Sequence, residues 1–154
     1  KRLVIYGGSA GGYTVLNALV HHPGFFKAGL CSYGVSNLFL LEMDTHKFEA
    51  HYTKQLVGYL PEAAEKFHAW SPIFHAEKIR DAVAIFQGSE DKVVPVEQSE
   101  EMVRLLQGNR VPHLYRLYEG EGHGFRKKAT LIDHYETIDR FLQQYVIFSF
   151  QEEK

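Results

Sequence analysis

The order of apolar and polar residues along the chain predicts strands that alternate with helices. Short runs that are apolar throughout indicate strands buried on both faces, whereas apolar residues spaced three or four apart indicate one face of a helix. The predicted strands are residues 3–6, 27–33, 82–87 and 113–118. The predicted helices are residues 13–21, 96–107 and 129–146, with a shorter helix that Pro61 opens and that ends at Trp70. This order predicts an α/β fold of about four parallel strands with helices on both faces.

The same pattern predicts where pockets and core residues lie. Residues 35–60 show mixed apolar spacing and follow the end of the second strand, which is where pockets form in α/β sheets. Trp70 is interpreted as a core residue. For the last helix, the predicted buried face consists of Ile132, Tyr135, Ile138, Phe141, Leu142 and Tyr145.

The first predicted strand runs directly into a serine flanked by glycines. Gly7, Ser9 and Gly11 occupy the fixed positions of G-x-S-x-G, and a helix follows. This context is typical of a nucleophile elbow, in which glycines avoid collisions with nearby backbone and permit a strained turn. The N–H of Ala10 can then point at a developing oxyanion. The alternative, a phosphate-binding turn, is less favoured because no Lys-Ser/Thr pair or third spaced glycine follows.

A serine nucleophile needs a base to accept its proton and a carboxylate to hold that base. Asp91 comes directly after the third predicted strand, and His123 lies in the glycine-rich loop after the fourth. Both therefore reach the same sheet edge as Ser9. Glu90 adjoins Asp91, but two neighbouring residues in a turn point in different directions. The other histidines, including His134, are interpreted as surface or hydrogen-bonded residues.

Composition narrows the classes of function. The chain has 154 residues, is 45% hydrophobic and carries a formal charge of −2 with scattered Lys and Arg, so we expect neither nucleic acid nor a membrane as a partner. No apolar run reaches the about 18 residues of a membrane span. The single cysteine, Cys31, excludes an internal disulfide and fits a cytoplasmic location. No metal-ligand spacing occurs, so no metal or cofactor is expected. Glu119 and Glu121 are interpreted as solvated loop acids.

Four motifs taken together resemble the prolyl oligopeptidase family of serine peptidases, and more narrowly its acylaminoacyl-peptidase and dipeptidyl-peptidase branches. They are GGSAGGY at residues 7–13, SP at residues 71–72, G-x-x-D-x-x-VP at residues 88–95 and EGHGF at residues 121–125. The resemblance implies Ser9, Asp91 and His123 as the triad, the Ala10 N–H as an oxyanion donor and short peptides as substrates. It also implies a longer parent protein with an N-terminal β-propeller.

Because the chain lacks an initiator Met and Ser9 comes so early, we expect residues 1–154 to be the C-terminal half of an α/β-hydrolase domain. The resemblance implies that the missing part supplies a second oxyanion donor, so the isolated chain should be nearly inactive. The apolar strand with Leu3 and Tyr6 at its ends would then lie at a sheet edge. Such an edge is expected to pair with another copy and give a homo-oligomer.

The substrate pocket is predicted to be apolar. The dipeptidyl branch resembles a pattern with Asn two residues after the triad Asp and aromatic residues around the pocket, but here Val93 occupies the first position. These departures favour an acylaminoacyl peptidase or a general oligopeptidase. The residues predicted to contact substrate are Tyr13, Val35, Leu38, Leu41 and Val94.

Two other functions remain open at this point. An esterase or lipase of the same fold would share the triad chemistry, so sequence does not separate it cleanly from a peptidase. A non-catalytic scaffold is the second alternative for the isolated chain. A serine-reactive fluorophosphonate probe distinguishes the scaffold from both enzymes.

Overall fold

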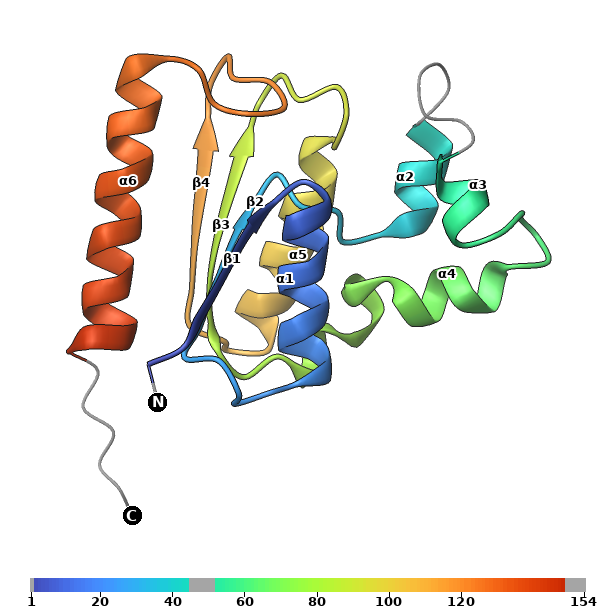
Figure 1. The fold of residues 1–154 in the computed structure, drawn as a ribbon, viewed down its shortest axis with the longest axis horizontal. Helices are drawn as coiled ribbons and strands as arrows, with labels where there is room; N and C mark the ends of the chain where they lie inside the picture. Colours follow the sequence, from blue (N-terminus) through green and yellow to red (C-terminus); the bar gives the residue numbers. More distant parts are fainter. Residues whose placement is uncertain (1, 45–51, 149–154) are drawn as a thin grey trace.

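Four parallel strands form one sheet in the order β1-β2-β3-β4 (Figure 1). The computed structural model describes residues 2–44 and 52–148. The strands are β1 (Val4–Gly8), β2 (Ala28–Ser32), β3 (Ala82–Gly88) and β4 (His113–Tyr118). All four correspond to predicted strands, and the α/β architecture is confirmed.

Helices cover both faces of this sheet. They are α1 (Ala10–His21), α5 (Val96–Gly108) and α6 (Lys128–Leu142). Helices α1 and α5 lie on one face and α6 lies on the other (Figure 1). Because successive strand residues point to opposite faces, Val83 and Ile85 pack with α1 and α5, whereas Ala84 and Phe86 pack with Phe141 of α6. The two cores explain why β3 is apolar throughout.

A group of shorter helices lies beside α1 (Figure 1). Its members are α2 (Leu38–Asp44), α3 (Tyr52–Leu56), α4 (Ala64–Trp70) and the 3-10 segment η1 (Pro72–Lys78). Residues 35–60, expected to be irregular, thus contain two helices, and residues 45–51 lie outside the described part of the chain. None of the described helices combines the length and apolar character that a bilayer-spanning helix needs.

The buried face of α6 differs from the predicted one. Phe141 is buried as expected, but Ile132 and Tyr135 are 50% and 63% exposed. The helix instead buries Thr130, His134 and Thr137 together with Phe141. The spacing of these residues is four, three and four, which places them on one stripe of a helix. The helix also ends at Leu142 and continues as the π-helical turn η2 (Gln143–Ile147).

His134 is therefore a core residue, and its interpretation as a surface or hydrogen-bonded residue was wrong. Its ring meets Phe86 and Phe125 edge to face, with centroids 4.4 and 5.1 Å apart. Its Nδ1 is buried and lacks a hydrogen-bond partner in the described part of the chain. Burial lowers the pKa of His134, an effect that the nearby Asp133 carboxylate opposes. The folded protein therefore favours the neutral imidazole.

This burial predicts a loss of stability in mild acid. The unfolded chain binds a proton at the ordinary histidine pKa of about 6.5, above the pKa of His134 in the folded state. The free energy of unfolding should therefore fall as the pH drops from about 7 to 5. Urea denaturation across this range should show the decline, and His134→Phe should flatten it. An equally steep decline in the variant would contradict the assignment to His134.

Candidate active site

Ser9 lies at the sharp turn between β1 and α1. Its φ of 57° and ψ of −121° are unusual for a residue with a side chain, and its N–H donates to the Ser32 carbonyl at 3.0 Å. A Cβ at Gly7 would lie 2.5 Å from the Gly11 carbonyl oxygen, so only glycine fits there. Glycine is not required in this way at Gly11, because a Cβ there would meet open space. The turn therefore depends on Gly7, which lets strand and helix backbones approach closely.

Helix α1 begins at Ala10, three residues earlier than predicted. The first N–H groups of a helix have no acceptor within the helix. The Ala10 N–H therefore belongs to the positive end of α1, next to the Ser9 hydroxyl. This position fits the predicted role of an oxyanion donor.

The structure brings Ser9, His123 and Asp91 together in a hydrogen-bonded row. His123 Nε2 lies 2.8 Å from Ser9 Oγ, and His123 Nδ1 lies 2.8 Å from Asp91 Oδ2. Because a carboxylate only accepts hydrogen bonds, the Nδ1 proton faces Asp91 and leaves Nε2 free to accept one from Ser9. Glu90 is exposed and takes no part in the row.

The Asp91 carboxylate is held firmly in the loop after β3. Its side chain is fully buried, and Oδ1 accepts the N–H groups of Val93 and Val94 at 2.9 and 2.8 Å. Gln87 Nε2 donates to Oδ2 at 3.3 Å. These donors fix the direction in which Oδ2 faces His123.

The Tyr33 ring packs against the His123 imidazole, a contact that sequence reasoning missed. Its ring meets those of His123 and Phe125 edge to face, with centroids 4.9 and 5.2 Å apart. A Cβ at Gly8 would lie 2.8 Å from the Tyr33 ring. The φ of Tyr33 is 38°, which is strained for tyrosine. The sequence feature that could have indicated this contact is an aromatic residue at the carboxyl end of a predicted strand. Burial, with Tyr6 and Asp91 adding to it, raises the pKa of Tyr33.

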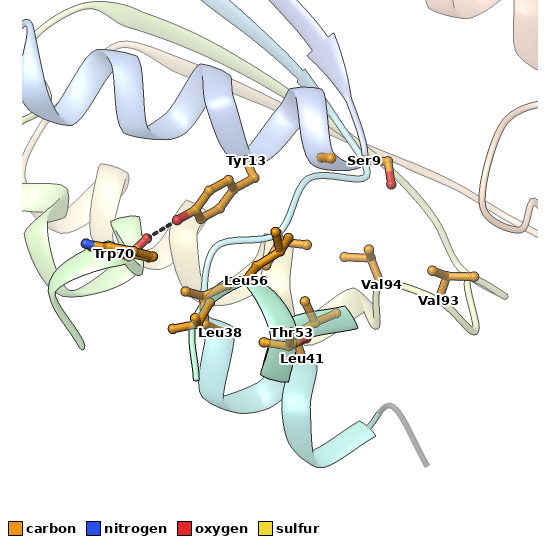
Figure 2. Close-up of a pocket in the computed structure, with 12 residues that line it drawn as sticks. Ser9, Tyr13, Leu38, Leu41, Thr53, Leu56, Trp70, Val93 and Val94 are labelled. Atoms are coloured by element: carbon orange, nitrogen blue, oxygen red, sulfur yellow. Dashed lines mark hydrogen bonds between the residues drawn. The ribbon is translucent and has the colours of Figure 1, made fainter. Parts of the chain in front are cut away.

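An apolar cavity of about 330 Å³ opens directly beside Ser9 and Ala10 (Figure 2). All five residues predicted to contact substrate line it: Tyr13, Val35, Leu38, Leu41 and Val94. The lining residues that were not predicted are Thr53, Leu56, Val57, Trp70 and Val93. Most of these come from α3 and α4, whose place beside the cavity could not be inferred from local pattern.

Trp70 lies in the wall of this cavity and not in the core, so the prediction for it was wrong. Its side chain is 45% exposed. The Tyr13 hydroxyl donates to the Trp70 carbonyl at 2.6 Å, a bond that joins α1 to the end of α4 (Figure 2). The Tyr13 hydroxyl therefore already has a hydrogen-bond acceptor. The buried Thr53 adds a further hydroxyl to an otherwise apolar wall. Among the described residues, no cluster of three or more His, Cys, Asp or Glu side chains suits a metal ion.

Comparisons with known proteins show similarity over nearly the whole chain. Dipeptidyl peptidase family member 6 of Caenorhabditis elegans is 32% identical over 150 residues, which cover 94% of this chain and 20% of that protein. A puromycin-hydrolyzing peptidase of Mycobacterium tuberculosis is 38% identical with a TM-score of 0.91, covering 96% of this chain and 22% of the other. An acylaminoacyl peptidase of Pyrococcus horikoshii, 20% identical with a TM-score of 0.86, shares the fold over 98% of this chain and 25% of its own.

The family assignment rests on nearly the whole chain. The chain spans about a fifth of the length of the curated relatives that it matches. Within that span, the model of the prolyl oligopeptidase family matches residues 1–147. This range includes the elbow, the hydrogen-bonded row and the apolar cavity. The chain therefore belongs to the prolyl oligopeptidase family.

Proposed function

We propose that this chain carries the catalytic centre of a serine peptidase that hydrolyses short peptides through an acyl-enzyme on Ser9. The observation that carries the proposal is the position of His123, which lies 2.8 Å from both Ser9 Oγ and Asp91 Oδ2. An imidazole held in this way can take a proton from one partner while the other stabilises the resulting charge.

In the acylation step, His123 Nε2 accepts the hydroxyl proton as Ser9 Oγ attacks the peptide carbonyl carbon. The Ala10 N–H stabilises the negative charge that develops on the carbonyl oxygen. His123 then gives the proton to the leaving amine nitrogen, and the C–N bond breaks. In the second step, water attacks the ester carbonyl carbon and His123 Nε2 takes a proton from that water. His123 then gives this proton to Ser9 Oγ as the ester C–O bond breaks and the peptide leaves as a carboxylic acid.

The cavity beside Ser9 is the proposed pocket for the side chain that precedes the cleaved bond, termed P1. Its walls are apolar, so a charged P1 side chain would lose water without gaining a partner. We expect kcat/KM for phenylalanyl substrates to exceed that for aspartyl or lysyl substrates by about 100-fold or more. Chromogenic amides that differ only at P1 measure this ratio, and a preference for a charged P1 would contradict the pocket assignment.

A variant in the cavity wall sharpens this test. Leu56 lines the cavity yet is 61% exposed, so Leu56→Trp adds bulk at the rim without disturbing the core. It should lower kcat/KM for phenylalanyl substrates more than for alanyl substrates. Leu105→Trp is the matched control, since Leu105 is 40% exposed on α5 and does not line the cavity.

Acylaminoacyl and dipeptidyl peptidases differ in the peptide end that they accept. Val93 stands where the dipeptidyl branch carries Asn, which favours an acylaminoacyl peptidase or oligopeptidase. In contrast, two relatives at 32% identity are named as a dipeptidyl peptidase and a dipeptidyl aminopeptidase. We propose that blocked and short internal peptides are cleaved. Acetyl-phenylalanyl amides, free dipeptidyl amides and puromycin, the substrate named for a 38% identical structure, should be compared in the full-length protein.

We also propose self-association through β1 and a cytoplasmic location. Strand β1 pairs only with β2 in the described sheet, and Leu3 and Tyr6 are 44% and 57% exposed. Sedimentation of this chain and of Tyr6→Lys tests the association, which the substitution should weaken.

The proposed cytoplasmic location is supported by Cys31, a buried free thiol whose pKa burial raises to about 12. Cell fractionation tests it.

A further inference from the structure

His123 lies in a loop whose own sequence gives it little rigidity. The flanking residues are Gly122 and Gly124, and Gly124 has a φ of 101° that suits glycine. Yet the row from Ser9 to Asp91 requires the imidazole to stay within hydrogen-bond distance of two partners. Contacts outside the two glycines must therefore hold the loop in place.

The Glu121 carboxylate makes such contacts. It was expected to be solvated, but Glu121 is 3% exposed. One carboxylate oxygen accepts the N–H of Arg126 at 3.1 Å, and the other accepts the N–H of Lys127 at 2.9 Å. Burial acts to raise the pKa of Glu121, but these hydrogen bonds outweigh it and hold the pKa below the ordinary range. The ionised side chain thus closes the His123 loop onto the residues that precede α6.

The backbone of Glu121 joins the same loop to the Asp91 loop. Its carbonyl accepts the N–H of Glu90 at 2.9 Å. A Cβ at Gly88 would lie 2.4 Å from the Glu121 carbonyl oxygen, so the two loops pack backbone against backbone. Glu121 is therefore bonded on one side to the loop that carries Asp91 and on the other to the start of α6.

We propose that Glu121 is a positioning residue, whose buried carboxylate sets where His123 stands between Asp91 and Ser9. This inference rests on the proposed function for its kinetic consequence only. A carboxylate is suited to the task because one oxygen accepts the N–H of Arg126 while the other accepts the N–H of Lys127. A neutral amide has one acceptor oxygen and would lose one of the two bonds.

The test compares Glu121→Ala and Glu121→Gln with Glu119→Gln in the full-length protein. Glu119 is the matched control because it is exposed in the same loop, and the hydrogen bond that it accepts from Ser89 Oγ at 3.0 Å needs only the one acceptor oxygen that glutamine keeps. Glu121→Ala should lower kcat for an apolar-P1 amide about 10- to 100-fold, the range expected for a misplaced catalytic group, with KM within about twofold. The kcat of Glu121→Gln should fall between those of Glu121→Ala and the wild type. The kcat of Glu119→Gln should match that of the wild type.

A spectroscopic readout separates this inference from the proposed function. Nitrogen chemical shifts of the His123 ring, assigned by loss of the signals in His123→Gln, report which ring nitrogen carries the proton. The wild type should show the Nδ1–H form, and Glu121→Ala a mixture. If the wild type hydrolyses nothing, the proposed function fails, and the ring shifts alone decide the role of Glu121. If Glu121→Ala does not fold, Glu121→Gln carries the test. A folded variant with wild-type ring shifts and kcat overturns the inference.

Discussion

Replacing Ser9 with alanine is expected to lower kcat for peptide hydrolysis by about 10⁴- to 10⁶-fold in the full-length protein. The reason is that Ser9 Oγ is the atom that bonds to the substrate, and no other hydroxyl lies in the row with His123 and Asp91 among the described residues. Removing a triad member leaves only substrate binding and oxyanion stabilisation. Initial rates with a phenylalanyl amide, read against a no-enzyme blank, measure the loss.

The control for this variant is substrate binding. Alanine removes one oxygen and leaves the apolar cavity intact, so the affinity for a peptide product or competitive inhibitor should change little. Hydrolysis within tenfold of the wild type would show that another residue is the nucleophile. Loss of inhibitor binding together with activity would instead indicate that the elbow itself had been disturbed.

Replacing Asp91 with asparagine is expected to lower kcat by about 10⁴-fold. The amide carbonyl would keep the N–H bonds of Val93 and Val94, which leaves the NH₂ group facing His123. The imidazole would then have to accept at Nδ1 and carry its proton on Nε2. In that form it donates to Ser9 Oγ and no longer accepts the hydroxyl proton.

Glu90→Gln is the matched control for this variant. It removes one negative charge from the adjacent residue, which is exposed and outside the hydrogen-bonded row. Its kcat should stay within about twofold of the wild type, because an exposed charge is screened by solvent. Equal losses in the two variants would attribute the effect to net charge in the loop and would argue against a specific bond between Asp91 and His123.

The positions of Ser9, Asp91 and His123 could be predicted from sequence because each follows the carboxyl end of a parallel strand. Parallel strands bring these ends to one edge, so residues 114 positions apart meet without any knowledge of side-chain packing. The glycines around Ser9 and His123 marked the two turns. The apolar residues after β2 marked one wall of the cavity for the same reason.

The errors arose where packing between elements decides the outcome. The apolar pattern of α6 predicted Ile132 and Tyr135 in the core. In the structure, His134 packs there instead, against the aromatic rings of β3 and β4. The sequence around Glu121 is that of an exposed glycine-rich loop. Its burial depends on the N–H groups before α6, which only the folded chain brings to it. The exposure of Trp70 likewise depends on how α4 lies against α1, which the local sequence does not determine.

The most direct test of the central claim is labelling with a fluorophosphonate probe followed by mass spectrometry of the full-length protein. The probe forms a stable bond only with a serine that a nearby base has activated. One adduct is expected, located on Ser9, absent from Ser9→Ala and formed much more slowly in His123→Gln. A folded protein that forms no adduct, or forms it on another residue, would contradict the claim that Ser9 is the nucleophile.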